Sequence, residues 1–123
     1  MKTPRVRLHL WLENEDGLLF GQGRMQLLAR IREHGSLRKA AEALGMSYRA
    51  AWGKLKATEA AAGASLVERL GSNRDGCRLS EFGEAMLESY ARWYDTVEQT
   101  ALAEAKSCFP WPVEGFAEKS GPA

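Results

Sequence analysis

The stretch that decides the fold runs from residue 35 to residue 58 and reads Gly-Ser-Leu-Arg-Lys-Ala-Ala-Glu-Ala-Leu-Gly-Met-Ser-Tyr-Arg-Ala-Ala-Trp-Gly-Lys-Leu-Lys-Ala-Thr. Ser36 and Ser47 each place a short side chain with an acceptor oxygen immediately before a helical pattern. Between the two patterns, Leu44-Gly45-Met46 leaves room only for a short turn. The stretch therefore predicts a helix, a tight turn and a second helix.

Each of the two predicted helices has an inner face and an outer side. Residues that share the inner faces at helical spacing are Ala40, Ala41 and Leu44 in the first helix and Ala50, Ala51, Leu55 and Thr58 in the second. The outer side of the second helix carries Tyr48, Arg49, Trp52, Gly53 and Lys56. Cationic and aromatic groups near a helix N-terminus suit DNA phosphates and base edges. On spacing alone, an ordinary helical hairpin with solvated charges is the alternative.

Length and composition bound the class of protein. A chain of 123 residues that is 45% hydrophobic fits one compact domain. Its apolar runs are short and its N-terminus lacks a signal-peptide core, so we expect a soluble, cytoplasmic protein. Neither Cys77 nor Cys108 has a second Cys or a nearby His at metal-ligand spacing. Both are predicted to be free thiols, and no metal or other cofactor is expected.

Charge is distributed unevenly along the chain. Residues 24–78 hold eleven Lys or Arg against five Asp or Glu, a net charge of +6. Residues 79–123 hold three basic against eight acidic residues, a net charge of −5. The basic surplus coincides with the paired helices, where a polyanion such as DNA would have to bind.

A β-hairpin and a helix are predicted ahead of the paired helices. From Arg5 to Glu13, apolar residues alternate with polar or aromatic ones at the two-residue period of a half-buried strand, and its apolar side is Val6, Leu8, Leu10 and Leu12. Residues 14–17 have turn chemistry, and residues 18–20 can return antiparallel. Apolar spacing then predicts a helix that ends near His34, with Gly35 as its C-terminal cap. His9 and His34 are interpreted as surface residues.

A second small ribbon is predicted after the paired helices, over about residues 66–79. Leu66 to Leu70 has strand character, residues 71–76 form a polar turn, and residues 77–79 can return as the second strand. The ribbon carries Arg69, Arg74 and Arg78. Beside a recognition helix it would be a wing that touches the DNA backbone or minor groove, and the alternative is a plain surface hairpin.

One long helix is predicted over residues 80–105. Phe82, Met86, Tyr90, Trp93, Val97 and Ala101 recur at steps of three or four residues. Because such a helix is too long for this small core, we expect part of it to pack on a second copy, and the alternative is packing on its own N-terminal hairpin. The predicted dimerisation residues are Leu8, Leu10, Met86, Tyr90, Trp93 and Val97. Residues 108–123 contain Pro and Gly and are predicted to form an irregular, flexible tail.

The strings Met46-Ser47-Tyr48-Arg49-Ala50-Ala51-Trp52, Leu66-Val67-Glu68-Arg69 and Leu79-Ser80-Glu81-Phe82-Gly83 resemble the N-terminal winged-helix DNA-binding domain of ModE-type molybdate-responsive transcriptional regulators. That domain is itself similar to the LysR-type DNA-binding domain. The resemblance covers about residues 5–105 and implies a homodimer with the helix from Ser47 in the major groove. This chain has no room for the family's molybdate-binding domains, so a stand-alone form is expected and oxyanion sensing is not supported. The turn of its predicted wing, residues 71–76, also contains less glycine than is usual in the family.

Together these observations predict a mainly α fold with small β ribbons: a winged helix-turn-helix domain over residues 1–107 with an N-terminal β-hairpin and a long C-terminal dimerisation helix. We expect a homodimeric transcriptional regulator that binds a palindromic DNA operator through a recognition helix at about residues 47–62. The predicted DNA-binding residues are Ser36, Arg38, Ser47, Tyr48, Arg49, Trp52, Lys56, Arg74 and Arg78. Trp52 could face the groove or pack beneath the wing, and packing is preferred.

Two other functions are weighed against DNA binding. A protein-interaction module is the alternative, because several aromatic residues lie outside the predicted DNA-binding helices and wing and could form a protein-binding surface: Trp11, Trp93, Trp111 and Phe116. An enzyme is not expected, because neither histidine has a sequence-apparent carboxylate or nucleophile partner and no phosphate-binding glycine loop is present.

Overall fold

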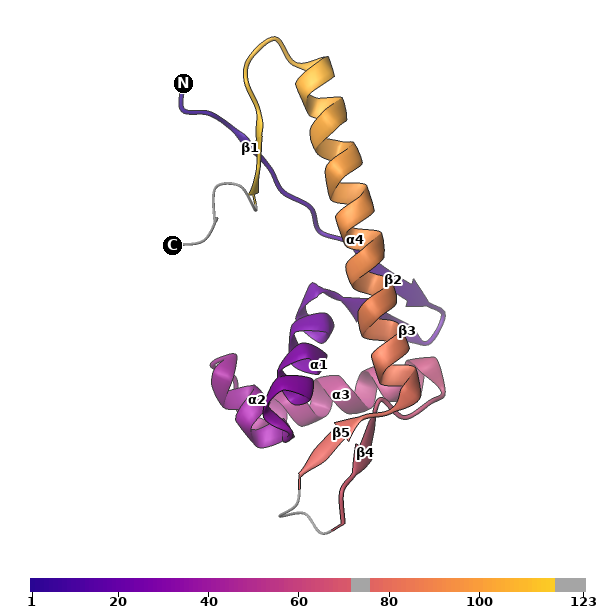
Figure 1. Cartoon of the computed structure of the whole chain (residues 1–123). Coiled ribbons are helices and arrows are strands. Elements are labelled where there is room, and N and C mark those ends of the chain that lie inside the picture. Colours follow the sequence, from indigo (N-terminus) through magenta and orange to yellow (C-terminus); the bar gives the residue numbers. More distant parts are fainter. Residues whose placement is uncertain (72–75, 117–123) are drawn as a thin grey trace. The chain divides into compact units, whose positions relative to one another are not determined.

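The computed structural model describes residues 1–71 and 76–116. The chain forms two compact units. The larger unit is Leu10–Ala91, and the smaller unit combines Met1–His9 with Arg92–Ala123, of which residues 117–123 lie outside the described part. Figure 1 shows the elements in chain order: β1 (Arg5–Val6), β2 (Trp11–Asn14), β3 (Gly17–Gly21), α1 (Gln22–His34), α2 (Leu37–Ala43), α3 (Tyr48–Ala62), β4 (Val67–Arg69), β5 (Cys77–Leu79), α4 (Glu81–Cys108) and β6 (Glu114–Gly115).

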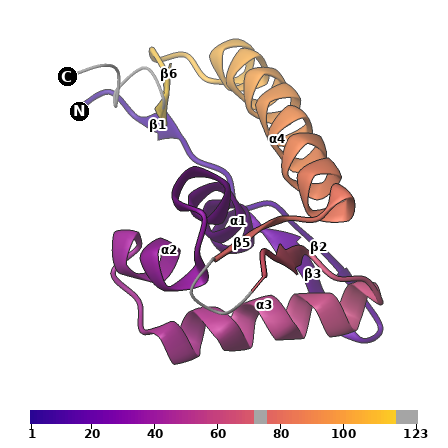
Figure 2. The same cartoon turned by 60° about the horizontal axis from the view of Figure 1, so that its bottom comes forward.

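The core of the larger unit is built from α1, α2 and α3, which confirms the predicted helix-turn-helix and the helix before it. Ala40 of α2 and Ala51 of α3 are fully buried, and such small side chains allow the two helices to approach closely. In Figure 2, α2 lies near one end of α3 and the β2–β3 hairpin near the other. The largest fully buried side chains are Phe20, Leu27, Leu28, Ile31, Leu66 and Thr58. The predicted inner face is wrong at Ala50, which is exposed, because neighbouring helix residues point in different directions and the next residue, Ala51, is the one that faces the core.

A polar link joins α1 to α3 inside this unit. Thr58 is buried, and its hydroxyl accepts a hydrogen bond of 3.0 Å from Arg24 Nε. Burial lowers the pKa of the Arg24 guanidinium from its ordinary value. The pairing satisfies a hydroxyl that would otherwise be costly to bury, and it fixes α3 against α1.

The predicted N-terminal strand is divided into two strands with different partners. β2 pairs antiparallel with β3, from Trp11 opposite Gly21 to Asn14 opposite Gly17, which confirms the hairpin. β1 instead pairs in parallel with β6, so that Arg5 lies opposite Glu114. The segment 108–123, predicted to be irregular, therefore contains a short strand in its described part.

The alternation of exposure in the N-terminal segment follows the predicted period up to residue 10. Val6, Leu8 and Leu10 are half-buried, whereas the basic residues between them are exposed. The prediction is wrong at Leu12, which is exposed, because the register of the hairpin shifts between Leu12 and Glu13.

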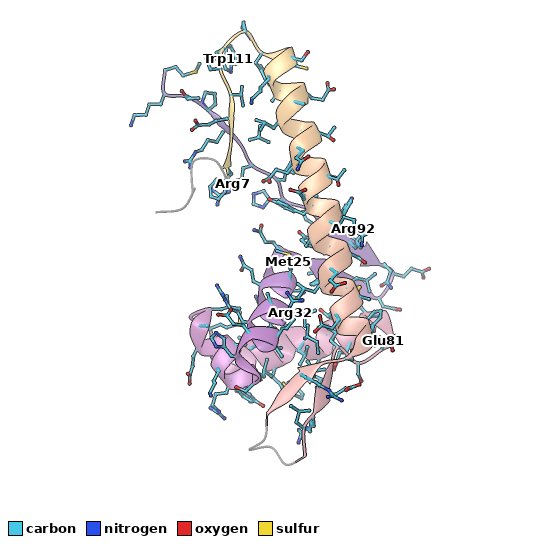
Figure 3. All side chains as sticks on the ribbon, viewed as in Figure 1. Arg7, Met25, Arg32, Glu81, Arg92 and Trp111 are labelled. Carbon is cyan, nitrogen blue, oxygen red and sulfur yellow. The ribbon has the colours of Figure 1, made fainter. Side chains whose placement is uncertain are left out.

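The long helix predicted over residues 80–105 is confirmed as α4, which is continuous from Glu81 to Cys108. Ser80 precedes it, and its hydroxyl accepts a hydrogen bond of 2.9 Å from the backbone N–H of Gly83. Arg32 of α1, labelled in Figure 3, forms an ion pair of 3.2 Å with Glu84 in the first turn of α4. Within the described residues, none of the helices combines the length and apolar character needed to cross a membrane.

Candidate nucleic-acid interface

One concave surface of the larger unit is formed jointly by the start of α2, the outer side of α3 and the inner face of the β4–β5 ribbon. It encloses about 290 Å³. Its rim and walls combine cations, aromatic rings and aliphatic side chains, a mixture suited to sugar-phosphate and base edges. The residues that line this reading surface are Ser36, Leu37, Arg38, Tyr48, Trp52, Leu55, Lys56, Val67, Arg69, Gly76 and Cys77.

Two serines predicted to contact phosphates cap the helices that build this surface. Ser36 Oγ accepts a hydrogen bond of 3.0 Å from the backbone N–H of Lys39, and Ser47 Oγ accepts one of 3.0 Å from Ala50. A hydroxyl that accepts a hydrogen bond keeps its own hydrogen to donate. Each serine can therefore start its helix and still donate to a phosphate oxygen.

Ser47→Ala is expected to lower the free energy of unfolding by about 1 kcal/mol, because the N–H of Ala50 loses its acceptor. Chemical denaturation followed by circular dichroism measures this change. The control is Ser89→Ala, at an exposed position inside α4, where alanine is the better helix former and no loss is expected. Equal losses in the two variants would contradict the capping role of Ser47.

Cations on the reading surface lie against aromatic rings. The Arg38 guanidinium carbon lies 4.8 Å from the centre of the Tyr48 ring, and Lys56 Nζ lies 5.8 Å from the centre of the Trp52 ring. Both distances are within the range of cation–π attraction. Trp52 is 47% exposed, so the interpretation of Trp52 as a residue packed beneath the wing is wrong. Arg49 is also exposed on α3.

The ribbon presents different arginines from those selected in the sequence. Glu68 lies opposite Arg78 in the register, and Arg69 lies opposite Cys77. Because side chains alternate across a strand, Val67, Arg69 and Cys77 share the face that lines the reading surface. Arg78 lies on the other face, where its Nε forms an ion pair of 3.0 Å with Glu68. The predicted wing contact Arg74 lies outside the described residues.

Arg69 is therefore a surface-lining cation that was not among the predicted site residues. The two-residue period of a strand could have identified Arg69, because this period places Arg69 on the same face as Val67 and on the other face from Glu68. Cys77 is half-buried beside it, and burial raises the pKa of its thiol. The thiol is therefore favoured over the thiolate on this surface.

The ribbon is rooted in the helices by backbone hydrogen bonds. The N–H of Cys77 donates to the carbonyl of Gly35, between α1 and α2, at 2.9 Å. Gly76 has a φ of +84°, and a Cβ there would overlap the carbonyl oxygen of Gly35. At the base of the ribbon, the N–H of Ser80, after β5, donates to the carbonyl of Leu66, before β4, at 2.9 Å. The first bond ties the ribbon to the junction between α1 and α2, and the second joins the ends of its two strands.

The residues predicted for dimerisation do not share one environment. Tyr90 is 3% exposed in a single chain, its hydroxyl donates to the carbonyl of Leu10 at 2.7 Å, and its ring lies 5.2 Å from that of Phe20. Tyr90 therefore belongs to the core of one chain and offers no surface to a second copy, because its packing partners come from its own hairpin. The other predicted dimerisation residues, Leu8, Leu10, Met86, Trp93 and Val97, are half-buried.

In the smaller unit, the N-terminal segment is held by α4 and by the last described residues. Tyr94 donates to the carbonyl of Leu8 at 3.4 Å. The Arg5 and Arg7 guanidinium carbons lie 5.4 and 4.5 Å from the centre of the Phe116 ring. Phe109 and Trp111, which follow α4, stack on each other and remain exposed.

Both cysteines are free thiols, as predicted. In the part of the chain that the structure describes, His, Cys, Asp and Glu do not gather in groups of three or more that could hold a metal ion. His9 and His34 are both exposed.

The comparisons with known proteins agree with this geometry. Residues 23–84 match the family described as bacterial regulatory helix-turn-helix protein, lysR family. The chain is 31% identical over 102 residues to the transcriptional regulator ModE of Haemophilus influenzae, a match that covers 81% of this chain and 38% of that protein. It is 29% identical over 104 residues to the molybdenum transport protein ModE of Azotobacter vinelandii, with 83% and 38% covered. The chain thus spans about 38% of the length of these curated relatives.

Solved structures show the same fold. The crystal structure of the CbnR DNA-binding domain in complex with DNA superposes with a TM-score of 0.58 at 23% identity, covering 71% of this chain and 97% of that one. ArgP from Mycobacterium tuberculosis has a TM-score of 0.51 at 32% identity, covering 68% of this chain and 30% of that one. The predicted winged helix-turn-helix fold is confirmed by these neighbours and by the three-helix core with its ribbon.

Proposed function

The chain belongs to the lysR family of bacterial regulatory helix-turn-helix proteins, and from this membership we propose that it binds a specific DNA operator as a homodimer and regulates transcription in the cytoplasm. The observation that carries the proposal is the reading surface, where the start of α2, the outer side of α3 and the inner face of the ribbon present Arg38, Lys56 and Arg69 together. It lies within residues 24–78, whose net charge is +6, with eleven basic and five acidic residues. The solved CbnR complex contains DNA, which supports the same partner for this chain.

In this proposal α3 enters the major groove, which is wide enough to admit one helix. Arg49, Tyr48 and Lys56 project from its exposed side toward the bases. Ser36, Arg38 and Ser47 contact phosphates from the starts of α2 and α3. Trp52 contributes an exposed ring to the same surface, and Arg69 replaces Arg78 as the wing cation on that face.

The homodimer is supported by α4, which continues for 28 residues. Trp93 and Val97 on this helix, with Leu8 of the N-terminal segment, remain half-buried in a single chain and can be covered further by a second copy. A twofold dimer presents two copies of α3 and so favours a palindromic operator. Molybdenum, named for the Azotobacter relative, is not transferred to this chain, because the similarity covers only 38% of that protein.

A protein-interaction module is the second candidate, favoured by exposed aromatic residues away from the reading surface. Trp11 is exposed on β2, and the stacked pair Phe109 and Trp111 is exposed after α4. Such rings are common in surfaces that recognise other proteins. Retention on heparin that does not change with salt concentration would favour this candidate over DNA binding.

Fluorescence anisotropy tests the proposed function. The purified chain is titrated against a labelled duplex from the region upstream of its own gene and against a duplex of random sequence, across a series of salt concentrations. We expect tighter binding to the upstream duplex, a steep salt dependence and two chains per site. Weak and identical binding to both duplexes would contradict specific operator binding.

A further inference from the structure

The carboxylate of Glu59 joins the recognition helix to the root of the ribbon. Its Oε2 accepts a hydrogen bond of 2.7 Å from the backbone N–H of Leu66, the residue before β4. Its Oε1 accepts one of 3.1 Å from Lys56 Nζ. The Glu59 side chain is only 12% exposed, whereas that of Lys56 is 49% exposed. One largely covered acid therefore holds a cation that lines the reading surface.

Leu66, at the other end of this link, makes further contacts of its own. Leu66 is buried, and its carbonyl accepts the N–H of Ser80 while its own N–H donates to Glu59. Both backbone polar groups of the residue that leads into β4 are thus paired. The hydrogen bond from Leu66 positions the Glu59 carboxylate independently of Lys56, so that the carboxylate can bind the Lys56 ammonium.

Helix stability does not account for the pair. Glu59 lies in the last turn of α3, where the helix dipole disfavours a negative charge. Lys56 precedes Glu59 by three residues, and the order with the acid first is the more stabilising one on a helix. The acid is unfavourable for the isolated helix, so its contacts with Leu66 and Lys56 are the features that explain it.

We propose that Glu59 is a positioning residue that holds the Lys56 ammonium back from DNA phosphates and so limits sequence-independent binding. This inference rests on the proposed function. Binding of any duplex depends largely on cations that replace the counterions of phosphates. Before Lys56 can bind a phosphate in this way, its ammonium must leave the Glu59 carboxylate beside it. The phosphate contact of Lys56 therefore adds less to the affinity for DNA.

The test uses Glu59→Gln in the full chain with a labelled duplex of random sequence. The amide oxygen of Gln can still accept the N–H of Leu66, but it lacks the charge that holds Lys56. We expect affinity to rise several-fold and the slope of log affinity against log salt to steepen by about 0.9, one additional phosphate contact. The slope separates this role from a purely structural one.

A double-mutant cycle assigns the effect to Lys56. In a Lys56→Ala background the gain from Glu59→Gln should largely disappear, because no ammonium remains to be released. The charge control is Glu33→Gln, which breaks the ion pair of 2.9 Å that Glu33 forms with Arg30 at the same spacing on α1, and it should leave binding nearly unchanged. An equal gain with and without Lys56, or the same gain from Glu33→Gln, would overturn the inference.

Hydrogen exchange at the Leu66 amide verifies the other half of the link. The amide should stay protected in Glu59→Gln and exchange faster in Glu59→Ala, which removes the acceptor. Fast exchange of the Leu66 amide in both variants would contradict the expectation that the Glu59→Gln variant keeps the hydrogen bond from Leu66. If the unmodified chain binds neither the random nor the upstream duplex, the proposed function itself fails, and this inference fails with it.

Discussion

Gly83→Ala is expected to lower the free energy of unfolding by about 1–3 kcal/mol, the usual range for an added methyl group in a packed interior. Gly83 lies in the first turn of α4 and is buried. A Cβ at this position would overlap the carbonyl oxygen of Leu66. That carbonyl also accepts the N–H of Ser80, so it cannot move without breaking the junction between ribbon and helix.

Thermal and urea denaturation measure this loss, and Gly53→Ala is its matched control. Gly53 also lies inside a helix, α3, but a Cβ there meets no atom within 4 Å. Alanine is the better helix former, so Gly53→Ala should stabilise the fold by about 0.5–1 kcal/mol. Opposite signs for the two substitutions are the expected result. A stabilised Gly83→Ala variant would contradict the close approach of α4 to the Leu66 carbonyl oxygen.

Arg49→Ala is expected to weaken binding of the upstream duplex by about 5- to 150-fold, which corresponds to about 1–3 kcal/mol for one bidentate contact with a guanine. Binding of random sequence should fall less, because there the loss is one charge among many. Arg49 is exposed in the first turn of α3, where base-reading residues of such helices lie.

The matched control for Arg49→Ala is Arg30→Ala, which removes the same charge from an exposed position on α1. It should change the affinity for both duplexes only slightly. Anisotropy titrations with the upstream and random duplexes provide both values for each variant. Equal losses on the two duplexes in Arg49→Ala would assign Arg49 to the phosphates and contradict its proposed role in reading bases.

The site was predictable where it depends on one helix. Tyr48 and Lys56 lie on the outward side of α3 that follows from a period of 3.6 residues, and the structure exposes both, whereas for Trp52 on the same side the preferred interpretation was packing beneath the wing. The contribution of the ribbon was harder to predict from the sequence. Arg69 and Arg78 are equally basic, and only the register with β5 and the side on which α3 lies show that Arg69 lines the reading surface.

Two further features depended on which parts of the chain pack together. Tyr90 follows the apolar spacing of α4 as a dimerisation residue would, yet its partners are Leu10 and Phe20 of the same chain. β1 pairs with β6, more than one hundred residues later, and neither short strand has a pattern that specifies the other. The prediction of Tyr90 as a dimerisation residue failed because periodicity tells which face of a helix is apolar and not what covers it. The strand β6 was missed because residues 108–123 were predicted to be irregular from their Pro and Gly.

Local signals in the sequence specify the starts of α2 and α3 and the end of α1. Ser36 and Ser47 cap N–H groups three residues away, and Gly35 ends α1 with a bond to Ile31, so these signals act within one turn of the chain. In contrast, the link from Lys56 through Glu59 to Leu66, and the position of Arg69 beside α3 on one surface, follow only from how the elements pack. Capping bonds need only near neighbours, whereas a shared surface or a buried partner exists only after distant elements have packed.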